Sequence, residues 1–143
     1  MATRSTIAVR HEDGTVSQIY CHWDGYLSHN GKLLMEHYNT LLGAEFLVSK
    51  GDLSVLAPRV TPDKDAVHTF KVAQNGVCVY YGRDRGEDGT EPKQFASVAE
   101  YLDNFQGEDY NYFFNGESWE VTYGETDFIL VEQAMKLETE DCE

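Results

Sequence analysis

The side chains most capable of chemistry lie in one short string, Cys21-His22-Trp23-Asp24-Gly25-Tyr26. A thiolate, an imidazole and a carboxylate can bind a transition metal or act as nucleophile and base. Adjacent strand residues point to opposite faces, so Cys21 and His22 cannot hold one ion unless the strand ends between them. The same geometry opposes their pairing as nucleophile and base, although His37 or His68 could approach Cys21 from elsewhere in the chain. We expect Cys21 and Trp23 to face the core, His22 to bond Asp24 or a backbone carbonyl, and Gly25 to permit a turn. The string therefore predicts neither a metal site nor a catalytic residue.

A second cluster, Arg83-Asp84-Arg85-Gly86-Glu87, places two arginines among acidic residues. Local pairing with Asp84 and Glu87 is the favoured interpretation, and guanidinium groups left free would bind phosphate or carboxylate. Known nucleotide-binding glycine motifs do not occur, so no cofactor is predicted. One hypothesis combines these arginines with earlier residues in a pocket for a small phosphorylated molecule, such as a signalling nucleotide. Its residues would be Arg4, His22, Asp24, Arg83 and Arg85.

An aromatic run near the C-terminus offers an interaction surface. Tyr110, Tyr112 and Phe114 alternate along a predicted strand and could stack on nucleic-acid bases. The neighbouring acidic residues would repel a phosphate backbone, which favours sheet core or a protein contact. These acids are Glu108, Asp109, Glu117 and Glu120.

Charge is distributed unevenly along the 143 residues, whose formal net charge is −14. Residues 1–83 hold eight acidic and eight basic residues, and residues 84–143 hold the other seventeen acidic and three basic ones. Such a field repels nucleic acids and anionic membranes and attracts basic protein surfaces. Solubility alone is the competing explanation for it.

The helices and strands that must position these residues can also be predicted. Together they indicate one α+β domain over residues 1–137, followed by an acidic tail over 138–143. Its antiparallel sheet would be built from hairpins, with two to three helices on one face. A Ser97/Glu100 capping box predicts one helix, and the polar stretch 82–92 predicts a surface loop. Hairpins are expected over 6–21, 70–81 and 110–123, and helices over 28–43, 44–50 and 97–107, with a last strand or helix from 128.

Three scattered cysteines are typical of reduced thiols, and no apolar run is long enough to span a membrane. The N-terminus lacks the layout of a signal peptide. These features predict a cytoplasmic protein without a membrane partner.

The strings Thr3-Arg4-Ser5, Cys21-His22-Trp23-Asp24-Gly25-Tyr26 and Arg83-Asp84-Arg85-Gly86-Glu87 resemble a family of small uncharacterised proteins of tailed phages and bacteria. The resemblance implies genome context and no specific chemistry, and it favours a role in host takeover or defence evasion in the infected cell.

Our first hypothesis from sequence is a phage accessory protein that binds and inhibits a host defence or nucleic-acid-handling protein. Its acidic, DNA-mimicking surface would contact a basic surface and not nucleic acid itself. A purely structural role is a third hypothesis, beside the arginine pocket. The partner-binding residues would be Glu108, Asp109, Tyr110, Tyr112, Glu117, Trp119 and Glu120.

Overall fold

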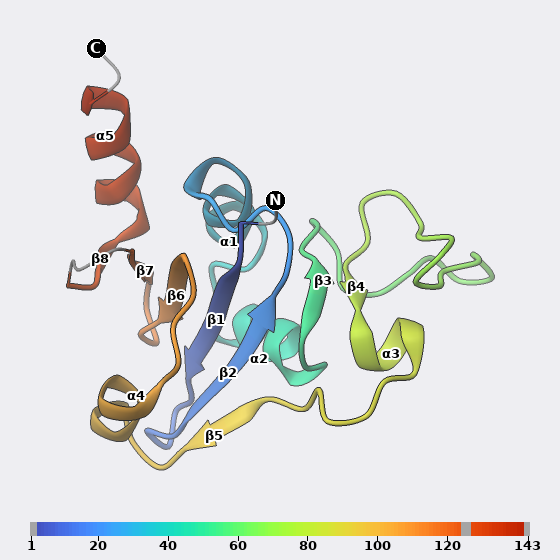
Figure 1. Cartoon of the computed structure of the whole chain (residues 1–143), viewed down its shortest axis with the longest axis horizontal. Coiled ribbons are helices and arrows are strands. Elements are labelled where there is room, and N and C mark those ends of the chain that lie inside the picture. Colours follow the sequence, from blue (N-terminus) through green and yellow to red (C-terminus); the bar gives the residue numbers. More distant parts are fainter. Residues whose placement is uncertain (1–2, 124–126, 142–143) are drawn as a thin grey trace.

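The computed structural model describes residues 3–123 and 127–141, and it is an α+β fold with one mixed, eight-stranded sheet (Figure 1). The main strand order is β4-β3-β2-β1-β6-β7-β8, and β5 pairs with β2 beside that path. The strands are β1 (Ser5–Arg10), β2 (Val16–Cys21), β3 (Leu53–Val55), β4 (Val79–Tyr80), β5 (Lys93–Phe95), β6 (Tyr110–Phe114), β7 (Trp119–Thr122) and β8 (Ile129–Leu130). The helices are the π-helix η1 (Leu27–Gly31) and α1 (Lys32–His37), α2 (Leu41–Ser49), α3 (Tyr81–Arg85), α4 (Val98–Asn104) and α5 (Val131–Asp141).

The sheet departs from the predicted antiparallel arrangement in two pairings. β1 lies parallel to β6, with Ser5 opposite Tyr110, and β2 lies parallel to β3 at Cys21 and Leu53. The predicted hairpin of β1 and β2 forms, and so does the hairpin of β6 and β7. The hairpin expectation was therefore right locally, but the pairings between distant segments make the sheet mixed.

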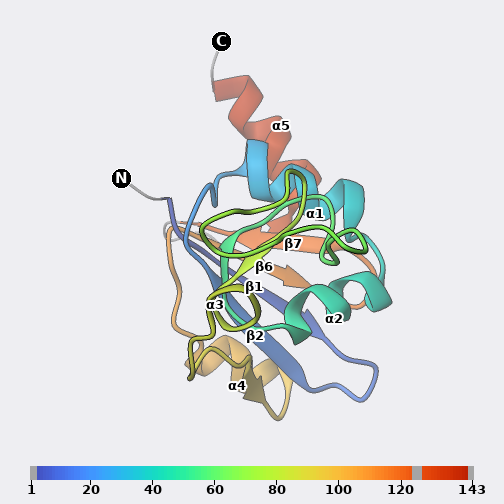
Figure 2. The same ribbon diagram turned by 90° about the vertical axis from the view of Figure 1, so that its right-hand side faces the viewer.

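Helices cover both faces of the sheet, not one as predicted, because β1 alternates its apolar side chains between two cores. Ile7 and Val9 join the larger core, which η1, α1, α2 and α5 cover. Ala8 joins the smaller core with Tyr101 of α4. Figure 2 shows α2 and α4 on opposite sides of the β1–β2 hairpin.

The helical region after residue 27 breaks earlier than predicted. Thr40 caps α2 by accepting a 3.0 Å hydrogen bond from the backbone N–H of Gly43. Gly43 therefore lies inside α2 and does not end a helix. The side chain of Tyr38, at the break, is buried and donates to the carbonyl of Ala57.

Two other local predictions are corrected. Residues 70–72 form no strand, and the chain after Gly76 pairs with β3 through β4 instead of closing a hairpin. The polar stretch 82–92 begins inside α3, which ends at Gly86 in a left-handed conformation. The capping box is confirmed, since Ser97 Oγ accepts from the N–H of Glu100 at 3.1 Å.

The C-terminal helix α5 runs from Val131 to Asp141 and so includes residues 138–141 of the predicted acidic tail. Residues 142 and 143 of that tail lie outside the described residues.

Gly51 holds the segment before β5 against the start of β3. Its φ is +90°, and a Cβ there would lie 2.3 Å from the carbonyl oxygen of Thr90. We expect Gly51→Ala to lower the free energy of unfolding by about 2–4 kcal/mol, because left-handed strain and a backbone clash add. Urea denaturation measures the change.

Gly76→Ala is the matched control for this substitution. Its φ is +80°, but nothing lies within 4 Å of the added Cβ. It should cost only the conformational part, about 1 kcal/mol. Equal losses in the two variants would contradict a specific contact between Gly51 and Thr90.

Candidate functional site

The string 21–26 is a tightly packed structural corner between β2 and η1. Cys21 is buried as expected, and the buried amide of Asn30 donates to Ser5 Oγ at 3.2 Å and to Cys21 Sγ at 3.5 Å. Trp23 is 44% exposed, so the expectation that it faces the core is wrong. His22 bonds the Tyr20 hydroxyl at 2.7 Å, not Asp24 or a carbonyl.

Asp24, not Gly25, takes the left-handed conformation at this corner, with φ +59°. Gly25 is required for a different reason: a Cβ would lie 2.9 Å from Ser5 Cβ and 3.0 Å from the Arg4 carbonyl. Its own carbonyl accepts from the buried Tyr112 hydroxyl at 2.7 Å. These contacts explain the string as packing between β2, β1 and β6.

Arg83 is held by the protein itself. Its guanidinium donates to Asp84 at 2.9 Å, to the carbonyl of Val60 at 2.5 Å and to the carbonyl of Cys78 at 2.9 Å. Asp84 is only 3% exposed and lies 3.3 Å from the equally buried His68. The favoured local pairing is thus present for Arg83, whose donors point to these internal acceptors.

The five residues of the predicted phosphate pocket lie on separate elements. Arg4, His22 and Asp24 belong to the ends of β1 and β2, whereas Arg83 and Arg85 belong to α3, which follows β4. Strand β3 separates β2 from β4 in the sheet order. Arg85 lies over the ring of Phe70, 4.8 Å from its centroid. No pairwise contact favours the nucleotide hypothesis.

The predicted partner-binding set is also divided, and two of its aromatic residues are buried. Tyr112 and Trp119 are buried, because Tyr112 bonds Gly25 and the Trp119 indole donates to the Tyr38 carbonyl at 3.0 Å. Tyr110 is half-buried and stacks on Tyr112. The acids lie at opposite ends of β6: Glu108 and Asp109 precede it, and Glu117 and Glu120 follow it.

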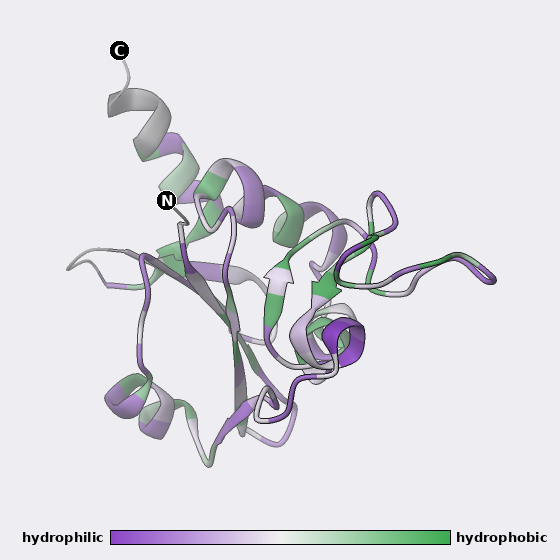
Figure 3. Cartoon of the chain, turned by 45° about the vertical axis from the view of Figure 1, so that its right-hand side comes forward, coloured by the Kyte–Doolittle hydropathy of each residue, from purple (hydrophilic) through white to green (hydrophobic). Residues whose placement is uncertain are grey.

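Glu108 instead lines an acidic pocket on the face of the sheet that α4 partly covers. The pocket encloses about 300 Å³, and β1 and β2 form its floor. Its walls are the segment before β5, largely hydrophilic in Figure 3, and the segment after α4. Three acidic residues, Asp52, Glu91 and Glu108, line it together with one basic residue, Lys93. The remaining lining residues are Thr6, Gln18, Ile19, Tyr20, Gly89 and Gln106.

Electrostatics in the acidic pocket favour a cation. Burial raises the pKa of Asp52, and the Glu91 carboxylate raises it further, against lowering by the Tyr20 N–H bond and Lys93. The Tyr20 N–H donates to Asp52 at 2.9 Å. Among the described residues, Nε2 of the buried Gln18 has no hydrogen-bond partner. The pocket thus holds excess negative charge and an unused donor.

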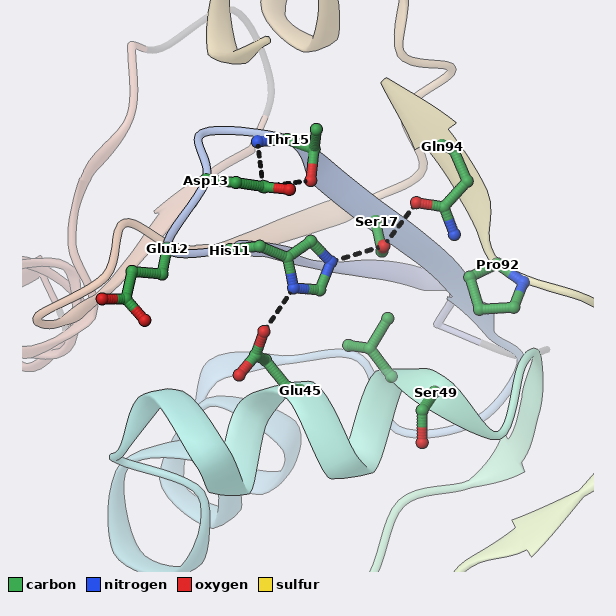
Figure 4. Close-up of a pocket in the computed structure, with 10 residues that line it drawn as sticks. His11, Glu12, Asp13, Thr15, Ser17, Glu45, Ser49, Pro92 and Gln94 are labelled. Carbon is green, nitrogen blue, oxygen red and sulfur yellow. Dashed lines mark hydrogen bonds and ion pairs between the residues drawn. The ribbon is translucent and has the colours of Figure 1, made fainter. Parts of the chain in front are cut away.

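A second pocket, the relay pocket, lies on the opposite face between the β1–β2 hairpin and α2 (Figure 4). His11 bonds Glu45 at 2.5 Å and Ser17 at 2.7 Å, and Ser17 bonds Gln94 at 2.7 Å. None of these residues was predicted as functional. The signal that the sequence offered for this pocket was Ser17. It is a polar residue on the strand face from which Ile19 and Cys21 point into the core.

Comparison of the chain with protein-family models, curated proteins and solved structures finds no match. The resemblance to phage and bacterial proteins therefore stays a prediction. No helix of the described residues is both long and apolar enough to cross a bilayer.

Cys21 is predicted to resist alkylation in the native protein. Burial raises the pKa of its thiol to about 12, so little thiolate exists near neutral pH. Iodoacetamide followed by peptide mapping should leave Cys21 unmodified from pH 7 to 9 and modify it after unfolding in urea. Rapid native alkylation of Cys21 would contradict this burial.

Asp52→Asn is predicted to stabilise the fold increasingly as pH rises. The pKa of Asp52 in the folded protein lies above its ordinary value of 3.8, so folding disfavours the ionised carboxylate. The wild type therefore loses stability as the pH rises from 3.8 through the folded-state pKa. The amide oxygen can still accept the Tyr20 N–H. Urea denaturation across this range, with exposed Asp103→Asn as control, should show a stability gain confined to Asp52→Asn.

Proposed function

We propose that this protein is an interaction module that binds a basic surface of another protein and occupies it in place of nucleic acid. The observation that carries the proposal is that Asp52, Glu91 and Glu108 line the acidic pocket together with a single basic residue, Lys93. A lysine or arginine side chain of the partner would enter this pocket. The resemblance to phage proteins makes a host nucleic-acid-handling or defence protein the expected partner.

Partial burial strengthens the attraction that such a pocket exerts. Two unit charges about 4 Å apart interact by about 4 kcal/mol at the effective dielectric constant of a protein surface, against about 1 kcal/mol in water. A partner's guanidinium would lower the raised pKa of Asp52 and restore a balanced charge. It would also remain planar and bidentate, which suits two carboxylates.

Acidic side chains outside the pocket extend the same negative surface. Glu87 and Asp88 precede β5 and are exposed, as are Glu100 and Asp103 on α4. These exposed carboxylates repel phosphate groups, which disfavours direct nucleic-acid binding, and they attract basic proteins toward this face. The buried Tyr112 and Trp119 play no part in this contact, so charge carries more of the recognition than the sequence suggested.

The proposal is tested with a labelled arginine-rich peptide and two variants of equal charge. Glu91→Gln with Glu108→Gln should weaken binding about tenfold, or about 1.4 kcal/mol, because two pocket charges are lost. Glu117→Gln with Glu132→Gln removes two exposed charges elsewhere and should change binding less than about twofold. Fluorescence anisotropy at low and high salt measures both.

The same pair of variants then identifies a natural partner. A bacterial protein retained by the wild type and the control, but lost from the pocket variant and at high salt, would support the proposal. Equal weakening of peptide binding by both variants would show that only total charge matters and would refute the pocket as the binding site.

A further inference from the structure

The relay pocket holds a serine, a histidine and a carboxylate in a defined order. Ser17 on β2 lies opposite Val9 of β1 in one direction and Gln94 of β5 in the other. His11 follows directly after β1, and Glu45 points from α2 toward it (Figure 4). The distances are 2.7 Å from Ser17 Oγ to His11 Nε2 and 2.5 Å from His11 Nδ1 to Glu45 Oε2. Three separate elements thus align the groups.

The role of each group follows from which of its atoms can donate and which can accept a hydrogen bond. The Glu45 carboxylate can only accept, so His11 Nδ1 carries a hydrogen. In the neutral ring Nε2 then accepts. In Figure 4, Ser17 Oγ donates its hydrogen to Gln94 Oε1 at 2.7 Å. Turning the Gln94 side-chain amide by half a turn places its nitrogen beside Ser17 Oγ in the same space, and the hydroxyl hydrogen can then point at His11 Nε2. That orientation is the resting arrangement of an activated serine.

We propose that Ser17, His11 and Glu45 form a nucleophilic site that transfers the acyl group of a small, uncharged carboxylic ester to water. Ser17 Oγ bonds to the carbonyl carbon while its proton passes to His11 Nε2. The ester C–O bond then breaks, and the alcohol leaves with that proton. Water attacks the acyl-serine and gives its proton to His11, which returns it to Ser17 as the carboxylic acid is released.

The remaining groups of the pocket define the substrate class. The cavity of about 650 Å³ has room for a small ester, and its wall carries three carboxylates, those of Glu12, Asp13 and Glu45, but no lysine or arginine. Anionic substrates are therefore repelled. With the amide turned in this way, the Gln94 nitrogen lies beside Ser17 and can stabilise the oxyanion formed on attack. Glu45 acts as a positioning residue through His11.

A fluorophosphonate probe tests the site independently of the natural substrate. The serine oxygen displaces fluoride from phosphorus, and its proton passes to the base, so labelling requires an activated hydroxyl. Peptide mapping of the full-length wild type should place the label on Ser17, and Ser17→Ala should abolish it. His11→Asn should slow labelling about 100-fold or more, and Glu45→Gln should slow it by a smaller factor.

Two controls separate the relay from ordinary surface chemistry. Ser28→Ala removes an exposed serine of η1, and His37→Asn removes a histidine whose partner is Glu36 at 3.8 Å. Neither should alter the labelling rate. Circular dichroism confirms that each variant is folded, and mapping of the wild type remains decisive should Ser17→Ala fail to fold.

Ester hydrolysis provides the second readout. The wild type should hydrolyse nitrophenyl acetate faster than a nitrophenyl ester with a free carboxylate, and Ser17→Ala should lose at least about 100-fold of the acetate rate. Absence of label at Ser17, or labelling unchanged in folded His11→Asn, would overturn the proposal. The three side chains would then serve only to attach α2 to the hairpin. Neither outcome affects the acidic pocket.

Discussion

The parallel pairing of β1 with β6 is the constraint on which the rest of the fold depends. It joins residues 5–9 to residues 110–114 and thereby attaches the acidic part of the chain to the neutral N-terminal hairpin. β1 is paired on both edges and buried on both faces, so it can alternate Ile7 and Val9 with Ala8 between two cores. It also brings Phe113 of β6 beside Ala8 of β1 in the smaller core, which Tyr101 of α4 completes. Closing so long a loop costs entropy, which the two cores together must offset.

The same alternation explains why two different pockets share one strand. On β2, Ser17 faces α2 and the relay pocket, and the adjacent Gln18 faces the acidic pocket. A one-residue slip of β2 would exchange these side chains and place an amide in the relay. The register is held by Ile7 opposite Ile19 in the larger core and by Ala8 opposite Gln18 on the other face. Hydrophobic packing therefore positions both sets of polar groups.

Local signals predicted much of the secondary structure, whereas long-range pairing escaped them. The hairpins over 6–21 and 110–123 and the Ser97 cap depend on neighbouring residues, so short stretches of sequence contain the necessary chemistry. The parallel partner of β1 is a hundred residues away, and no local pattern specifies it. Around Gly76 a turn-forming residue was misleading, because residue 77 bridges to Arg59 and not to the preceding segment. The same holds for the candidate sites. The acidic character of residues 84–143 could be predicted from the sequence, but the presence of Asp52, Glu91 and Glu108 in one pocket depends on the contact between Gly51 and Thr90.

Strand β5 contributes a side chain to each of the two pockets. Lys93 lies opposite Gln18 and lines the acidic pocket, while its neighbour Gln94 lies opposite Ser17 and bonds its hydroxyl. β5 is three residues long and pairs with β2 alone, so few hydrogen bonds resist its displacement. The backbone of β5 thus places neighbouring side chains in the two pockets, across a single layer of sheet.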